Sequence, residues 1–261
     1  MLIDAHCHYD AYSWQELDLA LKETRENNIL TLGTSMDPEG YARTKIISRN
    51  NPLIFPCFGI HPWNAHKYAD ALDIYSTQIK ESPLLGEIGL DFHFVKDASL
   101  YPQQRRVLEY FLQEAKSQKK LVNLHTKGAE NDILEYLRQY QLDHFIIHWY
   151  SGPLDLVERF LALGATFTIG VAVLNTKHVR KLASILPAER LLTETDNPGA
   201  LEWQTKKRGM PQVIKQVILK LAEIRSLDQA EMEFQIQENF KRLISANSNV
   251  LSLLTKLISS S

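Results

Sequence analysis

The sequence has little cysteine and no long apolar run, and both absences narrow the kinds of protein it can be. Only two cysteines, Cys7 and Cys57, occur in 261 residues, so a disulfide framework is excluded and two reduced thiols are expected. No stretch approaches the roughly 18 consecutive apolar residues of a membrane span. The first residues contain neither a basic cluster nor an apolar core, as a signal peptide requires. We therefore expect a cytoplasmic protein that makes no membrane contact.

An excess of charge of either sign is also absent. The 29 Lys and Arg residues nearly balance the 31 Asp and Glu residues, and the net charge is −2. This balance gives no global attraction to nucleic acid, so a nucleic-acid ligand would need a local basic lining or metal ions. The hydrophobic fraction of 44% and the charged fraction of 23% are those of an ordinary globular protein.

Short apolar runs alternate with amphipathic segments along the whole chain. The runs are rich in Ile, Val, Leu and Phe and mostly lack polar alternation, which is typical of parallel strands buried on both faces. We predict strands at Leu2–Ala5, Ile29–Gly33, Leu53–Gly59, Leu84–Ile88, Leu121–Leu124, Phe145–Ile147, Ala165–Ile169 and Arg190–Thr193. Helix-start signals lie between and after them: capping boxes at Ser13–Glu16 and Asp228–Glu231, Asp37 before Pro38, and prolines at 102, 153 and 211.

Eight strands, each followed by a helix, predict an α/β fold, namely a single (β/α)8 TIM barrel over residues 1–261 with extra C-terminal helices. An open, doubly wound sheet is the alternative, because periodicity alone does not exclude it. The length is close to the roughly 250 residues typical of one such barrel. Residues Asn247–Ile258 are expected to form one amphipathic helix, and Ser259–Ser261 a frayed end.

Six potential metal ligands follow the predicted strands. His6 and His8 end the first strand, and residues two apart in an extended chain share a face, so both imidazoles can reach one ion while Cys7 points away. The other four end the fourth, fifth, sixth and eighth strands: Glu87, His125, His148 and Asp196. The intervals, about 23 to 38 residues per strand–helix unit, fit a barrel, whose catalytic groups come from the C-terminal ends of its strands.

This set of nitrogen and oxygen donors suits Zn²⁺, Mn²⁺ or Mg²⁺. Six ligands are enough for two divalent ions with positions left for water and substrate, and Glu87 is the natural bridge between them. A single buried histidine is more often a hydrogen-bonded core residue; six ligand-type residues at matching strand ends favour a metal site instead. Asp4 is open to two interpretations, a residue that orients an imidazole or a polar residue at the start of a strand.

The motifs that contain these residues resemble those of the TatD family of metal-dependent hydrolases, which are similar to amidohydrolases. The motifs are Asp4–His8, Gly59–Trp63, Gly86–Asp91, Leu124–Thr126, His148–Gly152 and Glu194–Pro198, and Glu238–Arg242 resembles the closing segment of the family. The resemblance covers nearly the whole chain. One such motif is weak, but six in order at matching spacings are specific.

The resemblance implies a deoxyribonuclease that works from DNA 3′ ends. By position, it implies that one metal is held by His6, His8, Glu87 and Asp196, and the second by Glu87, His125 and His148. It also makes His61 an active-site residue near the substrate. Trp149, Asn197 and His93-Phe94 depart from the commonest pattern of the family. None of these departures removes a ligand, so they bear on the identity of the substrate.

We expect water activated by the metal to attack phosphorus or a carbonyl carbon. Asp196 is the candidate general base, and His61 is a candidate to orient a substrate oxygen or protonate the leaving group. Lys127, and the basic run Lys206–Arg208 after the eighth strand, are candidate phosphate contacts.

Two other functions are compatible with the same residues. The site could hydrolyse a carboxylic ester or amide, including the ester of an aminoacyl-tRNA, because the same chemistry serves carbon and phosphorus. Alternatively, the chain could be a non-catalytic scaffold with a structural metal, although structural zinc usually has four protein ligands and favours cysteine. The expected ligands are thus nucleic acid or a small phosphodiester or ester, with no obligatory protein partner.

Overall fold

The structure is a computed structural model that describes residues 1–142 and 144–245. The described part contains eight strands, each parallel to the strand it pairs with. They are β1 (Leu2–Cys7), β2 (Ile29–Thr34), β3 (Ile54–Cys57), β4 (Leu85–Gly89), β5 (Val122–His125), β6 (Phe145–Ile147), β7 (Ala165–Ile169) and β8 (Leu191–Thr193). All eight lie within the segments predicted from the sequence or extend them by one or two residues.

The strands follow one another in chain order, as in a (β/α)8 barrel. One sheet has the order β1-β2-β3 and a second has the order β4-β5-β6-β7-β8. A parallel bridge between Phe58 and Leu85 connects the two sheets. On the other side, β8 packs against β1, and the Asp196 N–H donates to the His6 carbonyl over 2.9 Å. An open, doubly wound sheet would reverse its strand order at a switch point. The barrel prediction is confirmed, and the open-sheet alternative is wrong.

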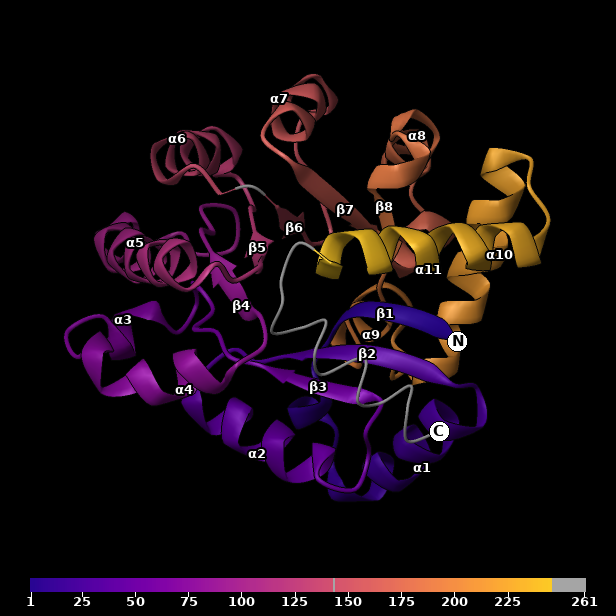
Figure 1. Ribbon diagram of the computed structural model, residues 1–261, viewed down its shortest axis with the longest axis horizontal. Coiled ribbons are helices and arrows are strands. Elements are labelled where there is room, and N and C mark those ends of the chain that lie inside the picture. Colours follow the sequence, from indigo (N-terminus) through magenta and orange to yellow (C-terminus); the bar gives the residue numbers. More distant parts are fainter. Residues whose placement is uncertain (143, 246–261) are drawn as a thin grey trace.

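The helices surround the strands in chain order, and α11 crosses one end of the barrel (Figure 1). The α-helices are α1 (Trp14–Glu26), α2 (Pro38–Ser48), α3 (Ala65–Tyr68), α4 (Ser76–Glu81), α5 (Tyr101–Gln118), α6 (Glu130–Tyr140), α7 (Val157–Ala162), α8 (Lys177–Ile185), α9 (Gly199–Thr205), α10 (Ile214–Arg225) and α11 (Gln229–Ser245). Short 3-10 helices are η1 (Tyr9–Ala11), η2 (Leu72–Tyr75), η3 (Ala98–Leu100), η4 (Leu154–Leu156), η5 (Val171–Leu174), η6 (Ala188–Arg190) and η7 (Pro211–Val213). Helices α9 to α11 after β8 correspond to the predicted extra C-terminal helices.

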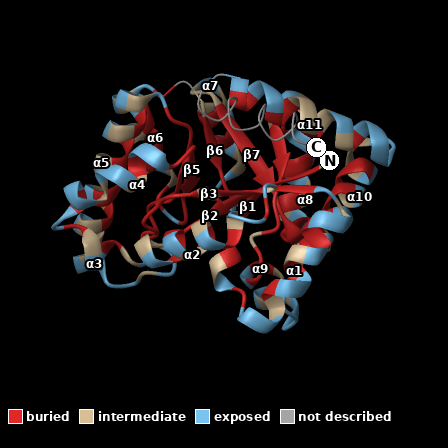
Figure 2. Ribbon diagram, turned by 60° about the horizontal axis from the view of Figure 1, so that its bottom comes forward, coloured by how far each residue is buried: buried red, intermediate tan, exposed pale blue. Residues whose placement is uncertain are grey.

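Most helices bury one apolar face against the strands and expose the other (Figure 2). In α5, for example, Val107, Phe111 and Leu112 are buried on the side that packs on β4. Each such side chain contributes about 1.5–3 kcal/mol relative to leaving it in water. This burial, summed over the helices, fixes the strands whose ends carry the candidate site.

The helix starts predicted from capping residues are confirmed. The Ser13 hydroxyl accepts from the Glu16 N–H, and the Glu16 carboxylate accepts from the Ser13 N–H. Asp228 and Glu231 make the same reciprocal pair before α11. The segment predicted to be a tail helix, Asn247–Ile258, lies outside the described residues, so this prediction and the extent of the domain over residues 1–261 stay untested.

Strand β3 is shorter than the predicted Leu53–Gly59 because the chain makes a close approach at its end. A Cβ at Gly59 would lie 2.4 Å from backbone atoms of Glu87, so only glycine fits there. The tight contact between the end of β3 and the backbone of β4 helps to fix the position of Glu87.

Both cysteines are buried and free, as predicted. None of the helices in the described ranges combines the length and the apolar character needed to cross a bilayer.

Candidate metal centre

The six predicted ligands lie at the C-terminal ends of five strands. They are His6 in β1, His8 just after it, Glu87 in β4, His125 at the end of β5, His148 directly after β6, and Asp196 three residues after β8. The structure brings all six together, with Glu87 at the centre. Glu87 is 2% exposed, so its carboxylate faces protein groups rather than bulk water.

One oxygen of Glu87 faces the imidazoles of the first strand. Glu87 Oε2 lies 3.3 Å from His6 Nε2 and 3.3 Å from His8 Nε2. Asp196 Oδ1 completes this half, at 3.3 Å from His8 Nε2 and 3.7 Å from His6 Nε2. His6, His8 and Glu87 form one group whose ligand atoms are close enough to hold a metal ion.

The other oxygen of Glu87 faces three further imidazoles. Glu87 Oε1 lies 2.7 Å from His125 Nδ1 and 3.3 Å from His148 Nε2. His61, which follows β3, also reaches it, with Nε2 at 3.3 Å from Oε1. The spacing of His61, Glu87 and His125 again permits a metal ion. The two oxygens of one carboxylate therefore serve two separate groups of histidines.

Four of these imidazoles use their second nitrogen to donate to a fixed acceptor. His8 Nδ1 faces the Thr34 carbonyl at 3.1 Å, and His6 Nδ1 faces Asn123 Oδ1 at 3.0 Å. His125 Nε2 lies 3.0 Å from Asp91 Oδ2, and His148 Nδ1 lies 3.0 Å from Glu194 Oε2. Since carbonyl and carboxylate oxygens only accept hydrogen bonds, the nitrogens that face away from Glu87, the outer nitrogens, carry the protons. When these rings are neutral, the nitrogens that face Glu87, the inner nitrogens, have the lone pairs that a cation would bind.

His61 has the opposite arrangement. Its Nδ1 accepts from the Trp63 backbone N–H over 3.2 Å, so in the neutral ring the proton is on Nε2, the nitrogen that faces Glu87. Burial lowers the pKa of His61 to about 4, despite the nearby carboxylate of Glu87. The ring is therefore neutral at ordinary pH, and it presents an N–H rather than a lone pair to the site.

The electrostatics of the centre favour negative carboxylates surrounded by positive charge. Burial alone would raise the pKa of Glu87, but electrostatic interactions with the imidazoles of His61, His148 and His6 and the hydrogen bond from His125 hold it well below its usual value. Burial likewise opposes the ionisation of Asp196, yet the hydrogen bond from His8 and nearby imidazoles lower its pKa.

Two of the imidazoles attract protons that a cation would replace. Burial would lower the pKa of His148, but Glu194 and Glu87 raise it to about 10. The pKa of His8 is raised well above its usual value because Asp196 and Glu87 outweigh burial. Metal ligands must be deprotonated, so a divalent ion would displace these protons.

Lys127, the predicted phosphate contact, lies after β5 and is mostly buried. Its ammonium donates to the Trp149 carbonyl and to Ser151 Oγ, the latter over 3.1 Å, and it lies 5.2 Å from the centre of the Trp149 ring. Burial lowers the pKa of Lys127 to about 8, although Glu194, Asp196 and Glu87 oppose this. The structure thus places Lys127 at the edge of the centre, directed toward the loop after β6.

Sequence reasoning assigned no role to three residues that orient the imidazoles: Asp91, Asn123 and Glu194. All three are buried at 2% exposure or less. Asn123 could have been found by strand alternation, because it is two residues before His125 and shares its face. Asp91 and Glu194 lie inside the quoted motifs, but which imidazole each one meets depends on packing between strands.

Within residues 1–142 and 144–245, Asp4 makes no contact with an imidazole nitrogen. Its carboxylate accepts from the Thr195 backbone N–H over 2.8 Å and from Thr195 Oγ1 over 2.7 Å, which ties β1 to the segment after β8. Of the residues that depart from the family pattern, Asn197 is fully buried, and within the described residues its carboxamide has no hydrogen-bond partner. The backbone N–H of His93 donates to Asp91 Oδ1 over 2.9 Å.

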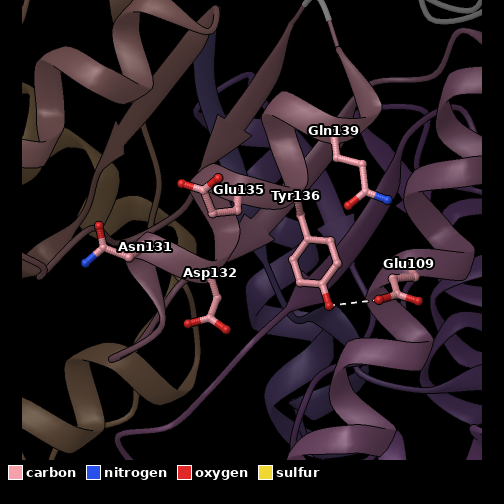
Figure 3. Close-up of a pocket in the computed structure, with 6 residues that line it drawn as sticks. All are labelled: Glu109, Asn131, Asp132, Glu135, Tyr136 and Gln139. Atoms are coloured by element: carbon pink, nitrogen blue, oxygen red, sulfur yellow. Dashed lines mark hydrogen bonds between the residues drawn. The ribbon is translucent and has the colours of Figure 1, made fainter.

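A surface hollow of about 460 Å³ lies elsewhere, between α5 and α6. It is lined by Glu109, Asn131, Asp132, Glu135, Tyr136 and Gln139, and the Tyr136 hydroxyl donates to Glu109 across it (Figure 3). Its residues come from the outer faces of helices rather than from strand ends. The hollow is therefore separate from the candidate centre.

Comparison with known proteins relates the chain to one family. The family model described as TatD related DNase matches residues 3–245. The chain is 25% identical over 254 residues to YcfH of Escherichia coli K12, named an uncharacterized metal-dependent hydrolase, covering 93% of this chain and 95% of that protein. It is 25% identical over 247 residues to the human deoxyribonuclease TATDN3, covering 88% of this chain and 90% of that protein.

Solved structures show the same fold. The crystal structure of YjjV, a TatD homologue from Escherichia coli K12, superposes with a TM-score of 0.84 at 24% identity and covers 93% of this chain and 97% of that chain. A TatD family hydrolase from Entamoeba histolytica superposes with a TM-score of 0.80 at 16% identity, again covering 93% and 97%. At these sequence identities, the superpositions show only that the fold is the same.

Proposed function

The chain belongs to the TatD-related DNase family of metal-dependent hydrolases, and on that premise we propose that it cleaves phosphodiester bonds at DNA ends with the help of two divalent metal ions. The observation that carries the proposal is that the two carboxylate oxygens of Glu87 face different groups of histidines. Its Oε2 faces His6 and His8, and its Oε1 faces His125 and His148. A carboxylate that serves two groups of donors is suited to bridge two ions.

The residues present fit such ions. His6, His8, His125 and His148 each donate with the outer nitrogen, so the neutral form of each ring has its lone pair on the inner nitrogen. Imidazole and carboxylate donors suit Zn²⁺ and Mn²⁺, and carboxylate also suits Mg²⁺. His6, His8, Glu87 and Asp196 would hold one ion, and Glu87, His125 and His148 the other. When bound, divalent ions acidify water and neutralise charge that develops on the phosphate.

The chain's own groups then have distinct tasks. Asp196, whose pKa is lowered, is ionised and accepts a proton from the attacking water as general base. His61 donates a hydrogen bond from Nε2 to a phosphoryl oxygen, because its proton is fixed on that nitrogen by the Trp63 N–H. Lys127, at the edge of the centre, contacts a phosphate next to the one that is cleaved. TATDN3, the related human protein named a deoxyribonuclease, supports DNA as the polymer.

The test is a cleavage assay with a metal series. Single-stranded DNA labelled at its 5′ end is incubated with protein stripped of metal by EDTA, and Mg²⁺, Mn²⁺ or Zn²⁺ is added singly. We expect stepwise shortening from the 3′ end only when an ion is present. Loss of a group that merely orients a ligand costs about 10–100-fold, so Glu87→Ala should lower the rate at least about 100-fold.

Glu135→Gln is the matched control, because Glu135 lies on the exposed hollow between α5 and α6 and its loss should leave the rate unchanged. Aminoacyl esters and p-nitrophenyl carboxylic esters are assayed in parallel. Metal-dependent turnover of these esters without cleavage of DNA would overturn the nuclease proposal and favour an esterase. Full DNA cleavage by Glu87→Ala would overturn the proposed role of Glu87.

A further inference from the structure

The last candidate ligand, Asp196, lies where regular strand pairing no longer fixes the chain. It is three residues beyond the end of β8, and β8 and β1 lie side by side but share no strand ladder among the described residues. The backbone of Asp196 has a φ of 48°, in the left-handed region that residues other than glycine seldom adopt. Its N–H donates to the His6 carbonyl, but one hydrogen bond does not fix both backbone angles. Contacts on either side must therefore hold this conformation.

Asp4 of β1 supplies the contact before Asp196. Its Oδ1 accepts from the Thr195 backbone N–H over 2.8 Å, and its Oδ2 accepts from Thr195 Oγ1 over 2.7 Å. Oδ1 also accepts from the backbone N–H of His6 over 3.4 Å. Asp4, Thr195 and His6 are each 1% exposed or less, so water does not compete for these hydrogen bonds. One carboxylate thus holds both the residue before Asp196 and the strand that carries His6.

The contact after Asp196 passes through the same threonine. Thr195 Oγ1 accepts from the backbone N–H of Asn197 over 3.3 Å, while it donates its own proton to Asp4. The Asn197 carbonyl accepts from the His8 N–H over 2.8 Å. The residues before and after Asp196 are therefore both tied to the Thr195 hydroxyl, and Asp4 fixes where that hydroxyl lies.

Alternation along β1 places Asp4 where it can do this. Residues two apart in a strand point to the same face, so Asp4 shares the face of His6. The side chain of Asp196 is the outcome: its Oδ1 lies 3.3 Å from His8 Nε2 and 3.7 Å from His6 Nε2. Distances from a metal to its ligands are defined to about 0.2 Å, so a backbone that moved by about 1 Å would take this oxygen out of reach.

We propose that Asp4 is a positioning residue for Asp196: through Thr195 it holds the left-handed backbone that directs the Asp196 carboxylate toward the first two imidazoles. The inference rests on the proposed function insofar as Asp196 is a metal ligand there, and it does not depend on which bond the protein cleaves. Asp4 thus orients a carboxylate, whereas the sequence suggested either an imidazole or no partner at all. Groups that orient a ligand affect the affinity for the ion without touching it.

The test separates the hydrogen bonds from the bulk of the side chains. Asp4→Ala removes both bonds to Thr195, whereas Asp4→Asn can keep both, because its oxygen accepts from the Thr195 N–H and its amide donates to the hydroxyl. Thr195→Val removes the hydroxyl at nearly constant volume, and Thr195→Ser retains it. Glu23→Ala is the control for general destabilisation. Glu23 is 8% exposed and accepts from the Gln212 N–H over 3.0 Å, which joins α1 to η7, and none of its hydrogen bonds within the described ranges involves a candidate ligand.

Binding of Zn²⁺ alone to the full chain, stripped with EDTA and then dialysed, is measured by isothermal titration calorimetry. We expect Asp4→Ala and Thr195→Val to weaken one of the two ions about 10–100-fold, as for other groups that orient a metal ligand, and to leave the other ion unchanged. Asp4→Asn and Thr195→Ser should recover most of this loss. Glu23→Ala should bind both ions like the unaltered chain, although it lowers the melting temperature.

His148→Ala identifies which ion is affected. It removes a proposed ligand of the other ion, so the double variant Asp4→Ala with His148→Ala should bind neither ion tightly. A double variant that holds one ion as tightly as His148→Ala alone would place Asp4 on the His148 side of Glu87 and overturn the inference. Equal effects of Asp4→Ala and Glu23→Ala on zinc binding would also overturn it.

Cleavage of DNA is assayed separately, so that the two proposals fail in different ways. Selective loss of one ion in Asp4→Ala, with no cleavage by the unaltered chain under any metal, would support the role of Asp4 and overturn the nuclease proposal. Metal-dependent cleavage by the unaltered chain, with unchanged zinc binding in Asp4→Ala and Thr195→Val, would leave the nuclease proposal standing and overturn the role of Asp4.

Discussion

At the scale of single residues, the outer hydrogen bonds of the imidazoles distinguish two kinds of histidine around Glu87. His6, His8, His125 and His148 donate outward, whereas His61 accepts from the Trp63 N–H. The distance of His61 Nε2 from Glu87 Oε1, 3.3 Å, is the same as that of His148 Nε2. Distance alone would therefore group His61 with the ligands, and only the position of its proton separates it from them.

This difference gives a prediction about metal content. His61→Ala should retain the full number of bound ions but lose about 10²–10³-fold in kcat, the usual cost of removing one hydrogen-bond donor from a reacting oxygen. His148→Ala should lose one ion because it removes a proposed ligand. Elemental analysis of the purified variants, together with kcat at saturating metal, measures both. Loss of an ion in His61→Ala would mean that His61 is a ligand.

Asp196 gives a second prediction at this scale. Asp196→Asn keeps the size and polarity of the side chain but removes its basicity, so metal-dependent cleavage should fall about 10²–10⁴-fold, as for other general bases. KM should change much less than kcat, because binding of the strand does not depend on this proton transfer. Undiminished turnover across pH 6–9 would eliminate Asp196 as the base.

The residues around the candidate ligands were less predictable than the candidate ligands themselves. His, Glu and Asp at strand ends are visible in the sequence because each follows an apolar run. The pairing of Asp91 with His125, or of Glu194 with His148, joins residues 34 and 46 positions apart. Such pairing depends on how neighbouring strands stagger, which no local pattern encodes.

At the scale of elements, Lys120 secures the end of α4. This lysine lies between α5 and β5 and is 5% exposed. Its ammonium donates to the carbonyls of Ile79, Lys80 and Ser82, the last two over 2.8 and 2.6 Å. The last carbonyls of a helix have no partner within the helix, and a positive charge there also interacts favourably with the helix dipole.

Lys120→Met should therefore lower the free energy of unfolding by about 2–3 kcal/mol, because hydrogen bonds to a charged group contribute more than neutral ones and their carbonyl partners stay buried. Urea denaturation followed by circular dichroism measures the change. Lys80→Met, at an exposed position of the same helix, is the control and should stay within about 0.5 kcal/mol. Equal effects of the two substitutions would contradict the capping role.

The elements themselves were largely predictable, because capping boxes, prolines and apolar runs act locally. The predictions that failed concern the ends of strands and helices, where tertiary contacts determine at which residue the element begins or stops. The predicted third strand continues to Gly59, but in the structure β3 stops at Cys57, since Phe58 pairs with Leu85 and Gly59 presses on the backbone of Glu87. The predicted helix after Pro153 begins with a turn of 3-10 helix, η4, before α7.

At the scale of the whole molecule, the closure of the barrel joins the two ends of the chain. Asp4 in β1 binds Thr195 after β8. Arg208, which follows α9, reaches the first helix: its Nε donates to Glu16 Oε1 over 2.9 Å, and its Nη2 donates to the Ala11 carbonyl. These contacts connect the first strand–helix unit to the last.

The Glu16–Arg208 pair predicts a pH dependence of stability. The hydrogen bond from Arg208 lowers the pKa of Glu16 from 4.5 to about 2. A carboxyl whose pKa is lower in the folded state stabilises the fold fully above the unfolded pKa, and this stabilisation is lost as the pH falls from about 4.5 to 2. Glu16→Gln, which retains the capping box, should be less stable than the unaltered chain at pH 7 and equal to it near pH 2.

Thermal denaturation at several values of pH between 2 and 7 measures the difference. The gap between the two proteins should narrow as the pH falls, and salt should also reduce it, because the pair is partly exposed. A gap that is constant with pH would mean that the charge of Glu16 contributes nothing and that only its size or hydrogen bonds matter.

The closure between β1 and the segment after β8 also has a consequence for synthesis of the chain. Asp4 and Thr195 are 191 residues apart, and ribosomes add about 5–20 residues per second. For about 10–40 s, therefore, the nascent chain presents His6 and His8 without Asp196, the partner that completes their half of the centre. A growing chain of this kind carries its first candidate ligands from the outset, yet it becomes a competent hydrolase only when almost all of it has been translated.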